Sequence, residues 1–350
     1  MLKKYDNVIK QQTEAGVVEE VDETDSGTPG STHFIPHRAV LKEDRATTKL
    51  HVVYDASSKR SGYASLNDCL ETGPNLAPLI FDILLRFRME KFALIGDLEK
   101  AFLSIGIDPK QRDFLRFLWV DDINSDNPTI KTLKFTSLAV GLTTSPYCLN
   151  ATIRQHLEGY RETSPDFVEH VINALYVDDY AASQNSDVES FELYTQLKNV
   201  FQARGFNMRK FASNSESLMQ LIEKEEGSIN QVQNLPTNEK EIENAEKSCL
   251  DSKLVAKNSE IVLEDDETFL KSTSNAVCTE NEIKVLGIPW NHVKDELKFD
   301  LSNFSAAAEQ ENITKRHILS TTARFFGPLG LLSPVIVPLK GIVQEVCDLI

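Results

Sequence analysis

Two adjacent carboxylates, Asp178 and Asp179, stand between a short apolar run that precedes them and a second one that follows. This pattern predicts a β-hairpin with both side chains at its tip. Asp-Asp is a poor turn sequence, because tight hairpin turns favour Asn-Gly or Asp-Gly and because neighbouring like charges repel. A divalent cation would offset the repulsion, since ions such as Mg²⁺ take carboxylate oxygens as ligands. The alternative is an acidic turn in solvent.

A third carboxylate, Asp97, closes the apolar run Phe92–Asp97, which predicts a buried strand that delivers a charged side chain at its end. If this strand lies beside the hairpin, three carboxylates meet. Three carboxylates are enough to hold two divalent ions about 3.5–4 Å apart. Such ions activate an attacking oxygen and stabilise the leaving oxygen in phosphoryl transfer.

The composition is that of an ordinary globular protein, with 350 residues, 41% of them hydrophobic and 26% charged. No apolar run approaches the ~20 residues of a membrane span, and the first residues lack the apolar core of a signal peptide. The five cysteines are scattered without a C-x-x-C spacing. This argues against a zinc site or a disulfide framework and favours a reducing, intracellular compartment.

The formal net charge is −16, which by itself counts against a nucleic-acid partner. Much of the acidic excess lies in one stretch, Glu216–Glu282, which contains 16 acidic residues and 6 lysines. Because this stretch is polar and lacks Trp and Tyr, we expect a disordered or loosely helical insertion that is mobile from about Ser217 to Ala276.

The remaining pattern predicts the elements that would position the carboxylates. Strands are expected over residues 33–41, 49–55, 114–120 and 130–138, and helices over 5–16, 78–88, 145–157 and 187–204. Ser145 is the expected N-cap of the third helix, with Pro146 in its first turn. Lys42, Arg45 and Lys49 make the first strand pair basic, so it is either a finger over nucleotide phosphates or a solvated hairpin.

Two further features bear on the class of protein. Asp25-Ser26-Gly27 has the form of the aspartic-protease triplet, but acidic residues precede it where a protease has an apolar strand, so we disfavour a protease. An apolar helix is expected over 342–350, and its position in the sequence indicates a fragment of a longer polyprotein.

Several motifs occur in a fixed order: Val52-Val53-Tyr54-Asp55-Ala56-Ser57, Ser65-Leu66-Asn67-Asp68, Arg86-Phe87-Arg88, Phe114–Trp119, Gly141–Pro146, Tyr176-Val177-Asp178-Asp179 and Phe326–Gly330. In this order they resemble the reverse transcriptase of LTR retrotransposons, and specifically the Bel–Pao group. The resemblance covers nearly the whole chain except the acidic insertion, and several motifs in order are more specific than any one of them.

The resemblance implies an α+β right-hand polymerase with fingers, a palm that contains an antiparallel sheet, and a partial helical thumb. The expected parts are a lead-in helix and loop (1–32), the fingers (33–92 and 108–138), the palm with the first catalytic Asp (93–107), the palm with the Y-x-D-D hairpin (139–215), the insertion (216–282), a primer-grip hairpin (283–294) and truncated thumb or connection helices (295–350). No RNase H or integrase segment is expected within 1–350.

The implied activity is RNA-directed DNA synthesis from dNTPs with two Mg²⁺ ions, for which Mn²⁺ could substitute. Asp97 and Asp178 would be metal ligands, with Asp179 as the less direct third carboxylate. Nucleotide contacts would come from Phe102, which would exclude a 2′-hydroxyl, and from His51, Lys100 and Lys210. Template or primer contacts would come from Tyr176, Val140, Gly141, Ser145, Pro146, Leu286 and Gly287. Without the resemblance, Phe102 is equally well explained as a core aromatic and Lys210 as a solvated lysine.

The expected partners are an RNA template, a DNA or RNA primer, dNTPs and the rest of the Pol polyprotein, with no membrane. The expected location is intracellular, in cytoplasmic retrotransposon particles or in the nucleus. Three positions depart from the family pattern: His51 replaces an Arg of the second finger strand, Val140 replaces an aromatic before the Gly-Leu turn, and Gly327 replaces an Asp before Pro-Leu-Gly. They leave open a non-catalytic remnant that keeps the fold and binds nucleic acid. A metal-dependent nuclease is the third alternative.

Overall fold

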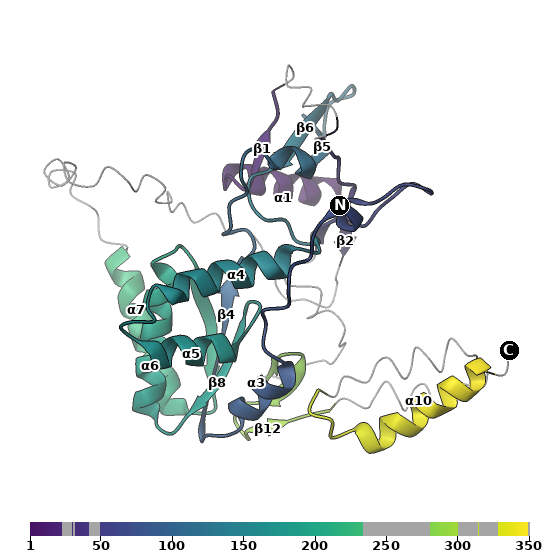
Figure 1. The fold of residues 1–350 in the computed structure, drawn as a ribbon. Helices are drawn as coiled ribbons and strands as arrows, with labels where there is room; N and C mark the ends of the chain where they lie inside the picture. The colour runs from purple at the N-terminus through teal and green to yellow at the C-terminus, as the bar shows by residue number, and fades with distance from the viewer. Residues whose placement is uncertain are drawn as a thin grey trace, which may run out of the picture.

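The computed structural model describes residues 1–22, 30, 32–41, 50–233, 281–299, 314 and 328–348. Helices pack against antiparallel sheets throughout these residues, which confirms the α+β class (Figure 1). Among the helices in the described ranges, none has both the length and the apolar character needed to cross a lipid bilayer.

The central sheet has four antiparallel strands in the order β7-β8-β4-β9. They are β7 (Leu175–Tyr176), β8 (Asp179–Gln184), β4 (Phe92–Glu99) and β9 (Asn207–Ser213). Alternate side chains of β4 enter different cores, Leu94 and Leu98 on one face and Ala93 and Ile95 on the other. The sheet is therefore buried on both faces, which explains why the sequence of β4 is almost continuously apolar.

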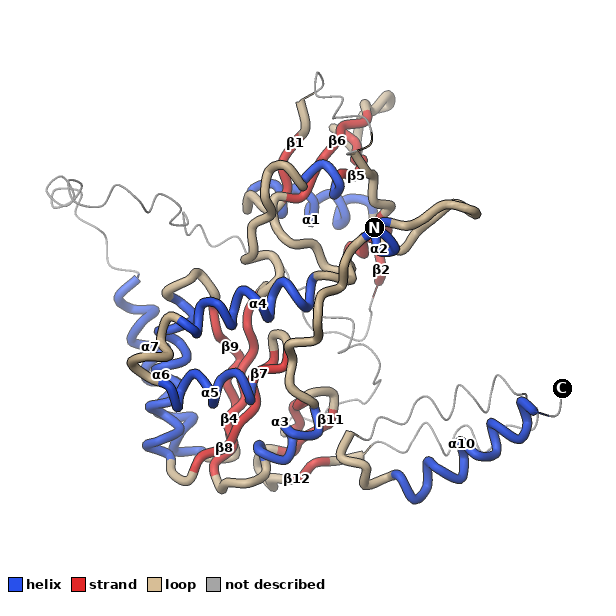
Figure 2. Tube along the Cα trace, in the orientation of Figure 1, coloured by secondary structure: helices blue, strands red, loops and turns tan. Residues whose placement is uncertain are grey.

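Three helices cover one side of this sheet, which we call the helical face (Figure 2). They are α4 (Ser145–Glu158), α5 (Pro165–Ala174) and α6 (Asp187–Gln202). Their buried residues recur every three or four positions, as with Leu149, Ile153 and Leu157 of α4, each at most 2% exposed. At the start of α6, the Ser186 side chain caps the helix by accepting a hydrogen bond from the Glu189 amide.

The opposite side of the sheet, which we call the hairpin face, packs against α3 (Ile80–Phe87) and the strands β10 (Glu282–Val285) and β11 (Ile288–Asn291), with β12 (Glu296–Leu297) beside β11. Phe87 and Trp290 are both fully buried, and their rings meet edge to face at 5.1 Å. Because β10 and β11 pair in antiparallel fashion, a hairpin is present in the region expected at 283–294. A second apolar core fixes this hairpin to the central sheet.

A smaller unit surrounds the N-terminal helix α1 (Leu2–Glu14). It contains the sheet β1-β6-β5 and the hairpin β2-β3. These strands are β1 (Val18–Glu20), β2 (His37–Leu41), β3 (Leu50–Tyr54), β5 (Arg116–Val120) and β6 (Ile130–Phe135). His37 joins three of the elements, because one ring nitrogen contacts the Tyr5 hydroxyl and Nε2 donates to the Leu118 carbonyl at 2.9 Å.

Several boundaries differ from the sequence expectation. Residues 1–32 were expected to hold only a helix and a loop, but residues 18–20 form β1, because they pair with β6 from a distant part of the chain. Phe114 lies in the 3-10 turn η1 (Arg112–Leu115), so β5 is shorter than expected. The N-cap of α4 is Thr144, and the Ser145 hydroxyl instead donates to the Ala139 carbonyl at 2.8 Å.

The expected disorder from residue 216 onward is wrong for residues 216–233, which form helix α7 (Glu216–Gln233). Leu218 and Ile222 are at most 1% exposed, and α7 packs against α6. The composition misled the prediction because one narrow apolar stripe suffices to dock a helix whose other positions are charged. Residues 234–280 of the insertion, the triplet at 25–27 and the Phe-x-Pro-Leu-Gly start at 326–327 lie outside the described residues. Of the last region, the structure describes mainly α10 (Ser333–Asp348).

A candidate catalytic site on the central sheet

The acidic hairpin is present, with a shift of one position. Tyr176 pairs with Asp179, so the turn residues are Val177 and Asp178, and Asp179 is the first residue of β8. The apolar run before the aspartates begins at the last residue of α5, Ala174, and continues through β7. Val177 has φ +58°, a conformation that is a genuine outlier for a β-branched residue. The conformation is maintained because Val177 is buried and the Leu98 amide donates to the Asp178 carbonyl at 2.9 Å.

Asp97 lies directly opposite Asp179 across β4 and β8, which confirms that the two strands are neighbours. Side chains of directly paired residues project from the same face, with Cβ atoms about 4.5–5.5 Å apart. Both residues follow the alternation of Ile95 and Ala181, so they belong to the hairpin face. Asp178, in the adjoining turn, is only 8% exposed. Three carboxylates therefore occupy adjacent backbone positions.

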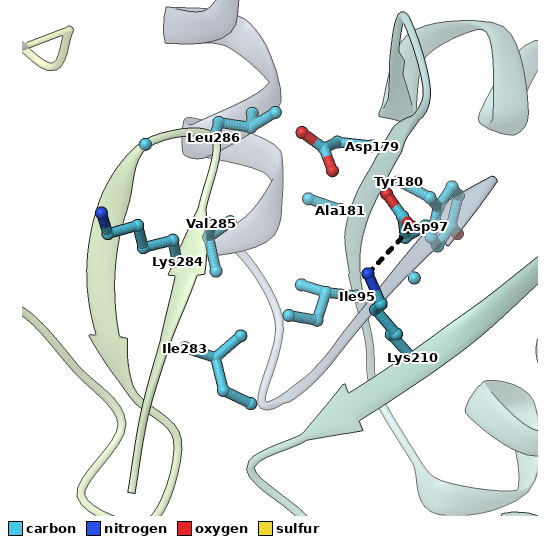
Figure 3. A pocket seen from close by; sticks show the side chains of 12 residues that line it. Ile95, Asp97, Asp179, Tyr180, Ala181, Lys210, Ile283, Lys284, Val285 and Leu286 are labelled. Carbon is cyan, nitrogen blue, oxygen red and sulfur yellow. Dashed lines mark ion pairs between the residues drawn. The ribbon is translucent and has the colours of Figure 1, made fainter. Parts of the chain in front are cut away.

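A β-bulge brings Lys210 to this face. Ile95 pairs with Ala212 and Asp97 with Arg209, so β9 contains one more residue than β4 between these pairs. Lys210 is at that bulge with φ +52°, and its Nζ lies 3.7 Å from Asp97 Oδ2 (Figure 3). Bulges commonly redirect a side chain next to a functional site. A Cβ on Gly96, opposite the bulge, would come within 2.9 Å of the Phe211 ring, so the strands approach closely only because Gly is present.

A pocket of about 250 Å³ opens between the two carboxylates and the β10-β11 hairpin (Figure 3). Asp97, Asp179 and Lys210 contribute its polar side, and Ile283 and Val285 contribute its apolar side. The hairpin turn at 286–287 closes one end, with φ +48° at residue 286 and +86° at residue 287. The turn at Leu286 and Gly287 and the Asp97 side chain thus line the same pocket.

Glu99 lies two residues after Asp97 on the same face and interacts with several polar side chains. This cluster was not identified from the sequence. The Glu99 carboxylate accepts a hydrogen bond from Asn207 Nδ2 at 2.7 Å and pairs with Arg209 at 3.0 Å and Lys100 at 3.6 Å. Burial lowers the pKa of Lys100, whose backbone has φ +49°. The i, i+2 spacing of Asp97 and Glu99 on a strand is the sequence signal that could have identified this cluster.

Behind the hairpin, Tyr180 anchors β8 from the helical face. It is 1% exposed, and its hydroxyl lies 2.8 Å from His170 Nε2 on α5. Burial raises the pKa of Tyr180 and lowers the pKa of His170, so the neutral pair is favoured. Burial also raises the pKa of Tyr176, which is half-buried at the other end of the turn.

The remaining predicted residues lie around this site in different ways. Phe102 is 7% exposed within the larger core, consistent with the core-aromatic explanation. His51 is half-buried on β3, opposite Val40, and is not among the residues that line the pocket. The basic residues between β2 and β3 lie outside the described residues. Val140 and Gly141 lie in the turn before α4, and Ser145 and Pro146 are the first two residues of α4.

The donor chemistry of the three aspartates suits a hard divalent cation, since carboxylate oxygens are its preferred ligands. Their backbone positions also fit, because two are paired across strands and the third is next in sequence. Their side chains, however, are not arranged as a ligand set. In the described part of the chain, no group of three His, Cys, Asp or Glu side chains is placed so that it could hold a metal ion. Asp97 faces Lys210 instead.

Comparison with known families gives one match. The family model described as "Pao retrotransposon-like RNaseH-like domain" matches residues 314–349. A search of curated proteins found no match to the chain. The family match supports an origin in a Bel–Pao retrotransposon Pol protein. It also shows that the expectation of no RNase H-related segment within 1–350 is wrong, because the matched residues lie in the region that we assigned to thumb or connection helices.

Proposed function

We propose that the central sheet is the catalytic centre of a reverse transcriptase, an RNA-directed DNA polymerase. The observation that carries the proposal is the direct pairing of Asp97 with Asp179, with Asp178 in the adjoining turn. Like charges placed directly opposite each other destabilise a sheet. Lys210 lies beside Asp97, and a divalent cation bound by the carboxylates would offset their mutual repulsion.

Asp97, Asp178 and Asp179 would hold two Mg²⁺ ions, or Mn²⁺ in their place. When bound, such ions supply activation of the primer 3′-hydroxyl and neutralise charge on the leaving pyrophosphate. The chain's own cations would bind the nucleotide. Lys210 Nζ, on the face of Asp97, would donate to a phosphate oxygen of the nucleotide or of the leaving pyrophosphate. Lys100, held by Glu99 at the end of β4, would bind the same triphosphate.

The β10-β11 hairpin would form the primer side of the site. Its turn at Leu286 and Gly287 faces the carboxylates across the pocket, and apolar side chains such as Val285 suit the sugar of a primer terminus. Tyr176 and the turn at Gly141–Pro146 would contact the template and the new base pair. The partners would be an RNA template, a DNA or RNA primer, dNTPs and other parts of a Pol polyprotein, in agreement with the Pao match.

Primer extension on poly(rA)·oligo(dT) with dTTP and Mg²⁺ tests the proposal. We expect extension by the wild-type chain, loss of extension in EDTA, and at least a 100-fold loss in Asp178→Asn, whose neutral amide is a poor ligand of a hard cation. The thermal midpoint of this variant should stay close to that of the wild type, because the residue lies in a turn. Undiminished Mg²⁺-dependent extension by Asp178→Asn would contradict the metal-site assignment.

Two other outcomes would identify the alternatives. Binding of the template–primer without extension would indicate a remnant that has lost catalysis, a reading that His51 in place of the family's Arg favours. Cleavage of the nucleic acid in the absence of dNTPs would indicate a nuclease. Fluorescence anisotropy with labelled template–primer and gel analysis of its length separate the three cases in one set of samples.

A further inference from the structure

The side chain of Asn67 bridges two parts of the chain that are far apart in sequence. Its Nδ2 donates to the Gly141 carbonyl at 3.0 Å and to Ser57 Oγ at 2.9 Å, and its Oδ1 accepts from the Thr143 amide at 3.0 Å. Both amide hydrogens and the carbonyl oxygen are therefore used. The orientation of the amide follows from its partners, because the reversed group would place oxygen against oxygen at Gly141 and N–H against N–H at Thr143.

Asn67 is itself firmly held. It lies on the one-turn helix α2 (Leu66–Cys69), which is closed by a reciprocal capping box between Ser65 and Asp68. Its backbone amide donates to the Ala56 carbonyl at 3.0 Å, which ties α2 to the residues just after β3. The side chain therefore reaches the turn before α4 from a rigid support.

The turn that receives Asn67 is packed tightly on the same region. Gly141 has φ +102°, and a Cβ at this position would lie 2.9 Å from the Tyr54 carbonyl at the end of β3. On the other side of the turn, the Ser145 hydroxyl donates to the Ala139 carbonyl. The turn is thus fixed from two sides, and Asn67 is the side chain that joins it to α2 and β3.

We propose that Asn67 is a positioning residue that sets the place of the Gly141–Thr143 turn, and through it the affinity for the incoming nucleotide. The second part rests on the proposed function, in which this turn faces the nascent base pair. The neutral amide is required because it must donate to one backbone group of the turn and accept from another, which neither a carboxylate nor an alkyl group can do.

Asn67→Asp and Asn67→Ala test the proposal. The first keeps the acceptor for Thr143 but places a carboxylate oxygen against the Gly141 carbonyl, and the second removes all three bonds. We expect amide hydrogen exchange of peptides covering 140–144 to accelerate at least tenfold in both. We expect KM for dNTP to rise about 5- to 10-fold in primer extension, the scale of one lost hydrogen bond, with kcat within about twofold of wild type.

Two matched variants separate positioning from general stability. Asn214→Ala also removes an asparagine that accepts from a backbone amide, of Ala93 at 2.8 Å, and donates to a backbone carbonyl, of Lys91 at 2.9 Å, but away from the turn. Ser57→Ala removes only the third partner of Asn67. In both, exchange over 140–144 and KM should remain within about twofold of wild type.

The outcomes are distinct. If Asn67→Asp and Asn67→Ala lower kcat in proportion to the folded fraction while KM and exchange over 140–144 stay unchanged, Asn67 is merely structural and the proposal is overturned. An equal effect of Asn214→Ala would overturn it as well. If the wild-type chain does not extend primers, the proposed function fails, and the exchange data alone decide whether Asn67 positions the turn. Unchanged exchange would then refute that as well.

Discussion

Val177, next to Asp178, has a left-handed backbone conformation with φ +58°, and so have Lys210 and Leu286, which line the pocket, with φ +52° and +48°. Residues other than glycine in this region cost on the order of 1–3 kcal/mol each and persist where the surroundings fix them. Here the hairpin turn, the bulge of β9 and the turn between β10 and β11 fix them. Three strained positions around a single group of carboxylates indicate selection for function more than for stability.

The opposed carboxylates give a prediction about stability. Asp179→Asn should raise the free energy of unfolding in EDTA by about 0.2–1 kcal/mol, because it removes a like charge directly opposite Asp97. Added Mg²⁺ should then raise the thermal midpoint of the wild type more than that of the variant, since an ion that binds only the folded state stabilises it. Thermal unfolding over a series of Mg²⁺ concentrations measures both. Asp126→Asn, in an exposed loop, should change neither quantity, and a variant less stable than wild type in EDTA would contradict the repulsion.

A second residue-level prediction concerns Phe102. If its ring occupies the space of a ribose 2′-hydroxyl, Phe102→Val should raise the ratio of kcat/KM for rNTP over dNTP by at least tenfold, besides lowering stability through loss of a buried ring. Phe206→Val removes a ring of similar burial from the same core, at 3% against 7% exposed. This control should lower stability without changing the ratio. Equal ratios in the two variants would make Phe102 a core residue only.

At the level of elements, α7 is part of the folded unit. Leu218 is fully buried and Leu221, on the outer side of the same helix, is 42% exposed. Leu218→Ala should therefore lower the free energy of unfolding by about 2–5 kcal/mol, and Leu221→Ala by less than about 1 kcal/mol. Urea denaturation followed by circular dichroism measures the difference. Similar values for the two variants would show that α7 does not dock on α6.

The N-terminal unit should lose stability in mild acid because of His37. Burial lowers the pKa of His37, so the unfolded chain binds its proton more readily than the folded chain. The stabilisation is complete above the ordinary histidine pKa of about 6.5 and is lost as the pH falls from there towards the lowered value. Burial also lowers the pKa of His33 in the same unit, which contributes in the same direction. His170 on α5, whose pKa burial lowers as well, adds the same dependence to the central sheet.

His37→Gln isolates this contribution, because a glutamine amide can still donate to the Leu118 carbonyl but does not titrate. The loss of unfolding free energy between pH 7.5 and 5.5 should be smaller in this variant than in wild type. Unfolding by urea at several pH values measures it. An identical pH dependence would mean that His37 contributes nothing to the acid sensitivity of the unit.

At the level of the whole molecule, the sequence predicted what depends on periodic apolar patterns. The strand that carries Asp97 and the helices α4 and α6 follow from local spacing. Helix α5 was not predicted, and the hairpin at 283–294 was expected only from the family resemblance. The bulge at Lys210 does not, because a lysine with positive φ has no sequence signature and depends on the closeness of Gly96 to Phe211. The β1-β6 pairing and the docking of α7 were missed for a related reason, since each depends on partners supplied by tertiary structure. The side-chain arrangement of the three aspartates could not be predicted from the sequence either, because it depends on the ion pair between Asp97 and Lys210.

The wall of the pocket that β10 and β11 supply is held in place by packing, chiefly of Trp290 against Phe87. This packing, rather than the number of residues between α7 and β10, sets the position of that wall. Because loop-closure entropy grows by only about 0.6 kcal/mol for each doubling of loop length, a change in that number should have a small effect on stability. Insertions and deletions between Gln233 and Glu282 should thus accumulate over evolutionary time with little selection against them, whereas substitutions at Phe87 or Trp290 should be rare.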